Sequence, residues 1–233
     1  MEYVGVPLNP DFSLNLPAVL TAIEQHRPSL IFIAYPNNPT GVCFKREEVE
    51  AVIRAATGIV VVDEAYGAFH HDSFLPWAGE VENLVVMRTI SKIGFAGLRM
   101  GYAAASPSII GELAKILPPY NMNQLSLAAA KFSLKHHQII QQNIDTLKND
   151  RSRVMNELLK LNRLEVFPSE ANFITVRVPD ANELFETLKQ NRILIKKLHG
   201  SHPLLDQCVR ITIGSAAQND AVLAVIRNLY PNL

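Results

Sequence analysis

The sequence is poor in cysteine and has no excess of charge of either sign. Its two cysteines, Cys43 and Cys208, lie far apart among apolar neighbours, which favours two reduced, buried thiols over a disulfide or a redox pair. The 22 Lys and Arg residues balance the 22 Asp and Glu residues, so the formal net charge is zero. Without a basic field, binding to nucleic acid or to an anionic membrane surface is not expected.

Long apolar runs and glycine-rich phosphate motifs are also absent. No segment approaches the length of a membrane span, no signal-like segment opens the chain, and no Rossmann or Walker glycine pattern is present. The histidine pairs His70–His71 and His136–His137 have no third ligand at suitable spacing, so no metal site is expected. These absences indicate a soluble, cytoplasmic protein. Its 233 residues, 48% of them hydrophobic, suffice for one large domain or about one and a half ordinary ones.

The first part of the chain alternates between strand-like and helix-like segments. Residues 29–36, 58–66 and 83–91 are short apolar runs typical of buried strands, and 45–56 has the pattern of an amphipathic helix. This alternation predicts βαβ units and a mostly parallel sheet. Residues 1–23 are interpreted as a strand, a loop and a helix that already lie inside a domain. In parallel α/β sheets, functional groups lie in the loops beyond the carboxyl ends of the strands.

The second part of the chain is first helical and then mixed. Residues 106–162 are mostly helical, and 122–161 runs without proline or glycine, which predicts either two helices or one helix that crosses between domains. A smaller α+β domain follows, with two short strands in 164–178, further strands at 193–198 and 208–214, and helices at 180–193 and 215–230. We therefore expect a large domain over residues 1–142 and a small domain over 143–233.

Polar residues follow the predicted strands at the positions where such a fold keeps its function. The segment "YPNNPTG" (35–41) is either a plain strand-to-helix connection or a turn that offers an asparagine amide to a ligand oxygen. Asp63 in "VVVDEAY" is either a helix cap or a carboxylate that meets a cation, and Tyr66 follows three residues later. Lys92 lies between Ser91 and an apolar Ile-Gly-Phe segment. Partial desolvation there would make its amine nucleophilic.

These residue types together describe a site for pyridoxal 5′-phosphate (PLP). Ser91 and Arg99 offer a hydroxyl donor and a planar guanidinium, the groups that hold a phosphate. Lys92 can form a Schiff base, and Asp63 can pair with a pyridinium nitrogen so that the ring accepts electrons. We therefore predict PLP as the cofactor and Lys92 as the acid and base of the reaction.

Five motifs occur along the chain in an order that is typical of one enzyme superfamily. They are "YPNNPTG", "VVVDEAY", "RTISKIGFAGLRMGY", "SEANFI" and "VRITIG". By these motifs the chain resembles the fold-type I PLP enzymes of the aspartate aminotransferase superfamily and, within it, the histidinol-phosphate aminotransferase family. The resemblance implies an α/β fold with a mostly parallel large-domain sheet and a smaller α+β C-terminal domain. It also implies a homodimer that transfers the amino group of L-histidinol phosphate to 2-oxoglutarate in histidine biosynthesis.

The same resemblance implies a role for each matching residue. Lys92 would carry the Schiff base, and Asp63 would face the ring nitrogen. The remaining cofactor ligands would be Asn38, with a cis bond to Pro39, and Tyr66 at the ring oxygen, and Ser91 and Arg99 at the phosphate. In "VRITIG", Arg210 matches the arginine that binds the substrate α-carboxylate.

The chain departs from the family pattern where the substrate phosphate binds. Lys196 stands where the family has an arginine, and lysine keeps the charge but loses the planar fork. Tyr120 and Asn123 of "PPYNMN" and Asn172 of "SEANFI" are further substrate-binding candidates, and a strand-capping turn explains Asn172 equally well. The alternatives are therefore another aminotransferase, such as an aromatic one, or an enzyme like threonine-phosphate decarboxylase.

Enzymes of this superfamily are considerably longer than 233 residues, and the resemblance begins well inside the large domain. The implied missing part includes the turn that also holds the cofactor phosphate and the aromatic ring that stacks on the cofactor. We therefore expect a sheet with unpaired edges and an uncovered apolar face. The chain alone is expected to be impaired, and a non-catalytic fragment is the third alternative.

Overall fold

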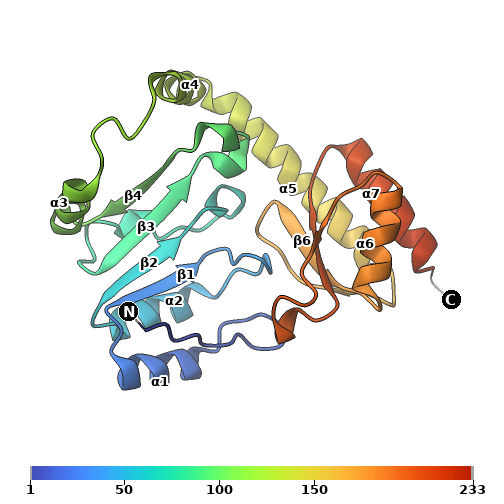
Figure 1. Cartoon of the computed structure of the whole chain (residues 1–233), viewed down its shortest axis with the longest axis horizontal. Coiled ribbons are helices and arrows are strands. Elements are labelled where there is room, and N and C mark those ends of the chain that lie inside the picture. Colours follow the sequence, from blue (N-terminus) through green and yellow to red (C-terminus); the bar gives the residue numbers. More distant parts are fainter. Residues whose placement is uncertain (1, 232–233) are drawn as a thin grey trace. The chain divides into compact units, whose positions relative to one another are not determined.

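The computed structural model describes residues 2–231 and contains two compact units, each with its own sheet (Figure 1). The first unit comprises Met1–Asn37 and Cys43–Gln141, and the second comprises Asn38–Val42 and Gln142–Leu233. In the part of the chain that the structure describes, no helix has the length and apolar character needed to span a membrane.

A four-stranded sheet forms the centre of the first unit. Strands β1, β2 and β3 are parallel in the order β1-β2-β3, and β4 continues the sheet antiparallel to β3. The prediction of a mostly parallel sheet is confirmed. The unit contains α1 (Leu16–His26), β1 (Leu30–Ala34), α2 (Arg46–Ala55), β2 (Ile59–Asp63), β3 (Leu84–Thr89), β4 (Gly101–Ala105), α3 (Pro107–Ile116) and α4 (Gln124–Lys135).

Two details of the first unit differ from the sequence-based expectation. Residues 2–9 form no strand, and Pro7, which has no backbone N–H to donate, disfavours one there. Strand β4 was not predicted, because its sequence GYAAA lacks β-branched residues. Its first residue must be glycine, since a Cβ at Gly101 would lie 2.7 Å from the Arg88 carbonyl oxygen.

One face of this sheet packs against α1 and α2. Helix α2 begins with acidic residues that suit a helix N-terminus, and it presents apolar side chains at helical spacing. The buried core on this face consists mainly of Ile23, Ile33, Val49, Val52, Ile53, Val60, Val62, Phe74, Leu84 and Val86. Because side chains alternate along a strand, Asp63 and Met87, which are paired neighbours in the register, lie on the opposite face.

The opposite face carries apolar side chains that this chain leaves exposed. Phe32 on β1 is 65% exposed, and Leu30 and Met87 are 37% and 38% exposed. Strands β1 and β4 form the two edges of the sheet. This face is therefore uncovered at Leu30, Phe32 and Met87, whereas Val61 and Val85 on the same face are only 5% exposed.

The second unit is an antiparallel sheet with helices packed on it. Its strands run in the order β5-β6-β8-β7. The elements are α5 (His137–Leu159), which starts in the first unit, β5 (Glu165–Val166), β6 (Phe173–Arg177), α6 (Ala181–Gln190), β7 (Lys196–Lys197), β8 (Cys208–Thr212) and α7 (Ala216–Leu229). The proline-free stretch 122–161 is thus two helices, α4 and α5. Ser215 caps α7, as its place at the start of the predicted helix suggested.

The core of the second unit joins one face of its sheet to α5, α6 and α7 (Figure 1). Its buried members include Val154, Leu158, Ile174, Val176, Leu184, Leu188, Val209, Ile211, Leu223 and Ile226. Neither cysteine forms a disulfide within the described residues; Cys208 on β8 is buried, whereas Cys43 in the first unit is only half-buried.

Replacing Leu184 by alanine should destabilise the second unit more than any change at its surface. Leu184 is 0% exposed, so the loss of its side chain leaves a cavity and should lower the free energy of unfolding by about 2–5 kcal/mol. The control is Leu194→Ala, at a leucine that is 79% exposed, which should change that free energy by about 0.5 kcal/mol or less. Urea unfolding followed by circular dichroism measures both values. Equal effects of the two variants would contradict this description of the core.

Candidate active site

The ends of β2 and β3 bring Asp63, Tyr66, Ser91 and Lys92 of the first unit into one region. The two strands are parallel neighbours, so the residues that follow them lie at the same end of the sheet, beyond the carboxyl ends of the strands. The Lys92 Nζ atom lies 5.2 Å from the centroid of the Tyr66 ring. Tyr66 is 6% exposed and Lys92 is half-buried. Lys92 forms no ion pair with a carboxylate within residues 2–231, so its amine is available to react.

Asp63 has the capping role considered for it. Its Oδ1 atom accepts a hydrogen bond of 2.9 Å from the backbone N–H of Ala65, which stabilises the turn after β2. The strand-end backbone is also held from β1, because the Tyr35 N–H donates to the Asp63 carbonyl oxygen. The carboxylate therefore acts as a local cap and still has a second oxygen for a cationic ligand.

Ser91 and Arg99 lie on two short 3-10 turns that follow β3, η3 (Ser91–Ile93) and η4 (Ala96–Leu98). The Thr89 hydroxyl donates to the Met100 carbonyl oxygen at 2.9 Å and lies 2.9 Å from the Ser91 hydroxyl, which holds Ser91 in place at the end of β3. Arg99 is exposed and has a left-handed backbone with φ of 54°. Its guanidinium makes one weak hydrogen bond, 3.4 Å to the Ala96 carbonyl oxygen. The Arg99 guanidinium is therefore available to an anion.

A buried ion pair beside these residues was not predicted. Glu64 is 2% exposed, and both Nε and Nη2 of Arg88 donate to its Oε2 atom, at 2.9 and 2.7 Å. Burial opposes the charge on Arg88, but the hydrogen bonds and negative charge of Glu64 prevail, and the pKa of Arg88 is raised. The sequence indicates the face of the sheet on which the two side chains lie, but not that they pair. Glu64 and Arg88 stand two positions after Val62 and Val86, the core residues of β2 and β3, so both point to the helix-covered face.

Tyr35 follows β1 and belongs to the buried core of the first unit. Its ring is 2% exposed, and its hydroxyl donates to Asp72 at 3.0 Å. Burial, reinforced by the nearby Cys43 and Asp72, raises the pKa of Tyr35 above its usual value. The phenol therefore stays neutral and keeps its hydrogen for Asp72.

In the second unit, Asn38 and Arg210 contact each other. Arg210 Nη1 donates to Asn38 Oδ1 at 2.7 Å, and the guanidinium carbon lies 4.7 Å from the centroid of the Phe173 ring. Because the Asn38 oxygen is occupied, its amide presents N–H donors to a ligand. The Arg210 Nε atom is buried and has no hydrogen-bond partner among the residues that the structure describes. The bond between Asn38 and Pro39 is cis, as the resemblance implied.

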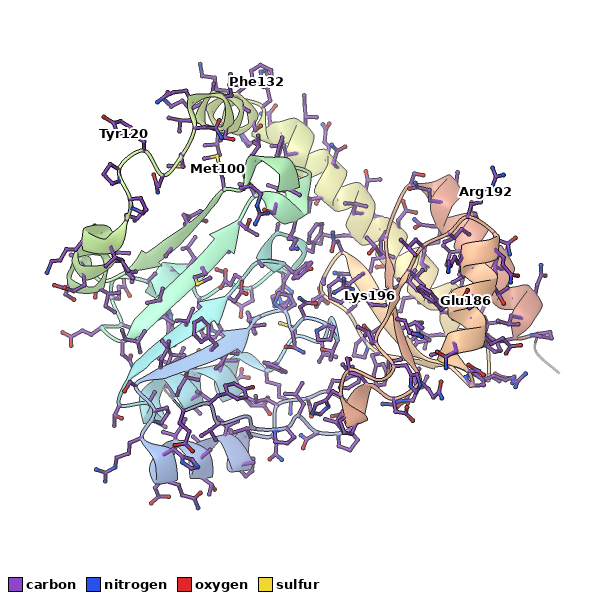
Figure 2. All side chains as sticks on the ribbon, in the orientation of Figure 1. Met100, Tyr120, Phe132, Glu186, Arg192 and Lys196 are labelled. Carbon is purple, nitrogen blue, oxygen red and sulfur yellow. The ribbon has the colours of Figure 1, made fainter. Side chains whose placement is uncertain are left out.

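The three other substrate candidates lie in different parts of the chain. Lys196 on β7, which Figure 2 labels, is exposed. It is the cross-strand partner of Arg210 on β8, so the two cations are neighbours on one face of the sheet. The Asn172 carbonyl oxygen accepts from the Ile213 N–H, which agrees with the strand-capping alternative. Tyr120 lies on the loop between α3 and α4 and is 97% exposed (Figure 2). Its role, like that of Asn172, remains a prediction.

Comparison with known proteins gives the family. The model of the aminotransferase class I and II family matches residues 1–226. The chain is 72% identical over 230 residues to a histidinol-phosphate aminotransferase of Neisseria meningitidis serogroup C, a match that covers 99% of this chain and 63% of the relative. The chain thus spans about 63% of the length of that curated relative.

Two solved structures show the same fold. A histidinol-phosphate aminotransferase from Clostridium acetobutylicum matches with a TM-score of 0.89 and 25% identity, over 97% of this chain and 70% of that one. One from Sinorhizobium meliloti, in complex with pyridoxal-5′-phosphate, matches with a TM-score of 0.85 and 28% identity, over 97% and 64%. The predicted fold-type I architecture is confirmed, with a partial large-domain sheet and a small antiparallel one. This chain belongs to the class I and II aminotransferase family.

Proposed function

We propose that this chain acts in the transamination of L-histidinol phosphate with 2-oxoglutarate, which yields imidazole-acetol phosphate and glutamate in histidine biosynthesis. The observation that carries the proposal is the 72% identity over 230 residues to a histidinol-phosphate aminotransferase. The arrangement of Lys92, Tyr66 and Asp63 at the ends of β2 and β3 supports it. A homodimer in the cytoplasm, with a large domain over 1–142 and a small domain over 143–233, is part of the same proposal.

The residues present fit PLP as the cofactor. Lys92 provides an amine without a carboxylate partner for the aldehyde, and Asp63 provides a carboxylate oxygen for the ring nitrogen. Ser91 and Arg99 provide a hydroxyl and a scarcely engaged guanidinium for the phosphate. When bound, the pyridoxal ring supplies an electron sink for the negative charge that develops at the substrate Cα.

Each candidate residue has a separate role in the proposed reaction. Lys92 attaches the cofactor and moves a proton to and from the substrate Cα. Asp63 keeps the ring nitrogen protonated, and Tyr66 and Asn38 bind the ring oxygen. Arg210 binds the α-carboxylate of glutamate or 2-oxoglutarate, and Lys196 beside it adds positive charge for the substrate phosphate.

Cofactor attachment and substrate profiling test the proposal in sequence. The purified chain is titrated with PLP, reduced with borohydride and digested, and the labelled peptide is identified by mass spectrometry. A pyridoxyl group on Lys92 supports the cofactor site, whereas label scattered over exposed lysines such as Lys115 contradicts it for this chain. Transamination rates are then compared for L-histidinol phosphate and unphosphorylated amino donors. A clear preference for the phosphorylated donor supports the assigned substrate.

A second candidate function is favoured by one observation, the lysine at position 196. A lysine in place of a planar arginine fork binds a phosphate as a point charge and is less selective for its geometry. An aromatic aminotransferase or a threonine-phosphate decarboxylase-like enzyme would fit this change. Release of carbon dioxide from L-threonine phosphate, or equal rates with aromatic amino acids, would favour the second candidate.

Removing the Arg99 guanidinium should mainly weaken cofactor retention. Arg99→Ala deletes a charge-assisted contact to the phosphate, so the dissociation constant of PLP should rise about 10- to 100-fold. Absorbance titration at constant ionic strength measures it. Arg54→Ala is the control, because Arg54 on α2 is equally a surface arginine and pairs with Glu50 at 2.7 Å. An unchanged constant in Arg99→Ala would remove Arg99 from the phosphate site.

A further inference from the structure

The Glu64 carboxylate is fully enclosed in the first unit and has a complete set of donors. Arg88 donates twice to Oε2, the Phe74 N–H donates to Oε1 at 2.6 Å, and the Ser73 hydroxyl lies 2.8 Å from Oε2. Arg88 Nη2 also donates to the Ser73 hydroxyl oxygen at 2.8 Å. The side chain of Glu64 is 0% exposed and that of Arg88 is 28% exposed. This geometry fixes the orientation of both partners.

The ion pair joins two chain segments beyond the point where their strands stop pairing. The last register pair of β2 and β3 is Asp63 with Met87. Glu64 and Arg88 are the next residue on each strand, and the Glu64 N–H still donates to the Met87 carbonyl oxygen. Beyond them, the chain continues to Tyr66 on one side and to Lys92 on the other. The side-chain link therefore lies between the last register pair and the residues Tyr66 and Lys92 of the candidate site.

The space around the pair leaves little freedom for it to shift. A Cβ added at Gly67 would lie 3.0 Å from the Glu64 Cβ and 3.4 Å from its Oε2. The Gly67 N–H donates to the Glu64 carbonyl oxygen at 2.9 Å, which closes the turn that carries Tyr66. A movement of Glu64 would therefore move the Tyr66 turn with it.

We propose that the Glu64–Arg88 ion pair is a positioning element that holds Asp63 and Tyr66 in place against Lys92. The proposal rests on the proposed function of Lys92 as the residue that attaches the cofactor. Buried ion pairs add little to stability compared with apolar residues of the same size, but they demand a strict geometry. A misplacement of about 1 Å at a reacting group can cost about a hundredfold in rate. An ion pair of fixed geometry next to Lys92 would prevent such a misplacement.

The test compares variants of the pair by two measurements on the 233-residue chain. The first is the acylation rate of Lys92 by a small anhydride in the cofactor-free chain, expressed relative to exposed Lys115 in the same sample. The second is the share of borohydride-fixed pyridoxyl label that falls on Lys92. Glu64→Gln and Arg88→Met should each change the relative acylation rate of Lys92 at least about threefold. Each should lower the share of pyridoxyl label on Lys92 to a similar extent. Arg88→Lys, which retains the charge, should restore part of both values.

The matched control is Arg151→Met in the second unit. Arg151 is 7% exposed and its Nη2 lies 2.9 Å from Glu170, so this variant also breaks an ion pair that has one buried member. It should lower the melting temperature but leave both Lys92 measurements unchanged. If the Glu64 and Arg88 variants behave in the same way as this control, the pair is only structural and the proposal is wrong.

Two further provisions keep the outcome decisive. Ser73→Ala removes one hydrogen bond to each partner without removing a charge, so it tests the proposal if the stronger variants do not fold, and it should shift both values in the same direction by less. If the unsubstituted chain takes no label on Lys92, the proposed function fails for this chain. The acylation ratio in the cofactor-free variants still decides whether Glu64 and Arg88 position Lys92.

Discussion

Replacing Lys92 by alanine should abolish the attachment of PLP and reduce transamination by about 10⁴-fold or more. The Lys92 amine, which lies beside Tyr66, can both form a covalent bond to an aldehyde and transfer a proton at the substrate Cα. Deleting a residue that performs such a step typically removes most of the catalysis. Rates are measured as single-turnover conversion of the amino donor, and attachment as reducible label in the Lys92 peptide.

The control for this variant is Lys115→Ala. Lys115 lies on α3 with an exposed side chain and pairs with Glu112 at 2.6 Å, so its loss removes the same charge without touching the candidate site. It should retain the full label on Lys92 and the activity of the unsubstituted chain. Turnover of Lys92→Ala within about tenfold of the unsubstituted rate would refute the assigned mechanism.

Replacing Asp63 by asparagine should cost about 10²- to 10³-fold in turnover, with a smaller effect on substrate affinity. Asparagine can still accept the hydrogen bond from the Ala65 N–H with its side-chain oxygen, so the turn after β2 should persist. What it loses is the negative charge that would keep the ring nitrogen protonated, and this charge matters most when negative charge develops on the substrate Cα. The measurement is kcat and KM with the preferred amino donor, together with the visible spectrum of the PLP-loaded chain.

A second carboxylate of the same unit provides the comparison. Asp72 accepts from Arg46 at 2.6 Å and from the Tyr35 hydroxyl at 3.0 Å, so Asp72→Asn also removes a partly buried negative charge. It should lower stability and leave the visible spectrum unchanged. If Asp63→Asn only destabilises the chain to the same degree, the carboxylate acts as a cap alone.

The region of the candidate site was accessible from the sequence because the signals are local. The apolar runs at 58–66 and 83–91 form β2 and β3, and the residues that follow them, Asp63–Tyr66 and Ser91–Lys92, lie at the same end of the sheet. Strand β4 was not predicted because Tyr102 is the one residue of GYAAA that favours a strand, and the strand forms through its pairing with β3. The periodicity of apolar side chains can be recognised within one segment. The strand that will pair with that segment cannot be recognised in this way.

The contacts between distant residues were not accessible in this way. Arg88 lies 24 positions from Glu64, and Arg210 lies 172 positions from Asn38. The sequence around each of these residues does not identify the residue that it contacts. The exposure of Tyr120 and the pairing of Lys196 with Arg210 likewise follow from loop placement and from the register of β7 on β8.

The sequence by itself determined which segments become strands and helices and which reactive side chains follow them, because side-chain shape and apolar period act over a few residues. Only the tertiary structure decided which charges meet. A buried carboxylate such as Glu64 must find donors wherever the sheet register and the packing bring them. Those partners, Arg88 and the Phe74 N–H, come from other strands and turns, and they set how Asp63 and Tyr66 are held beside Lys92.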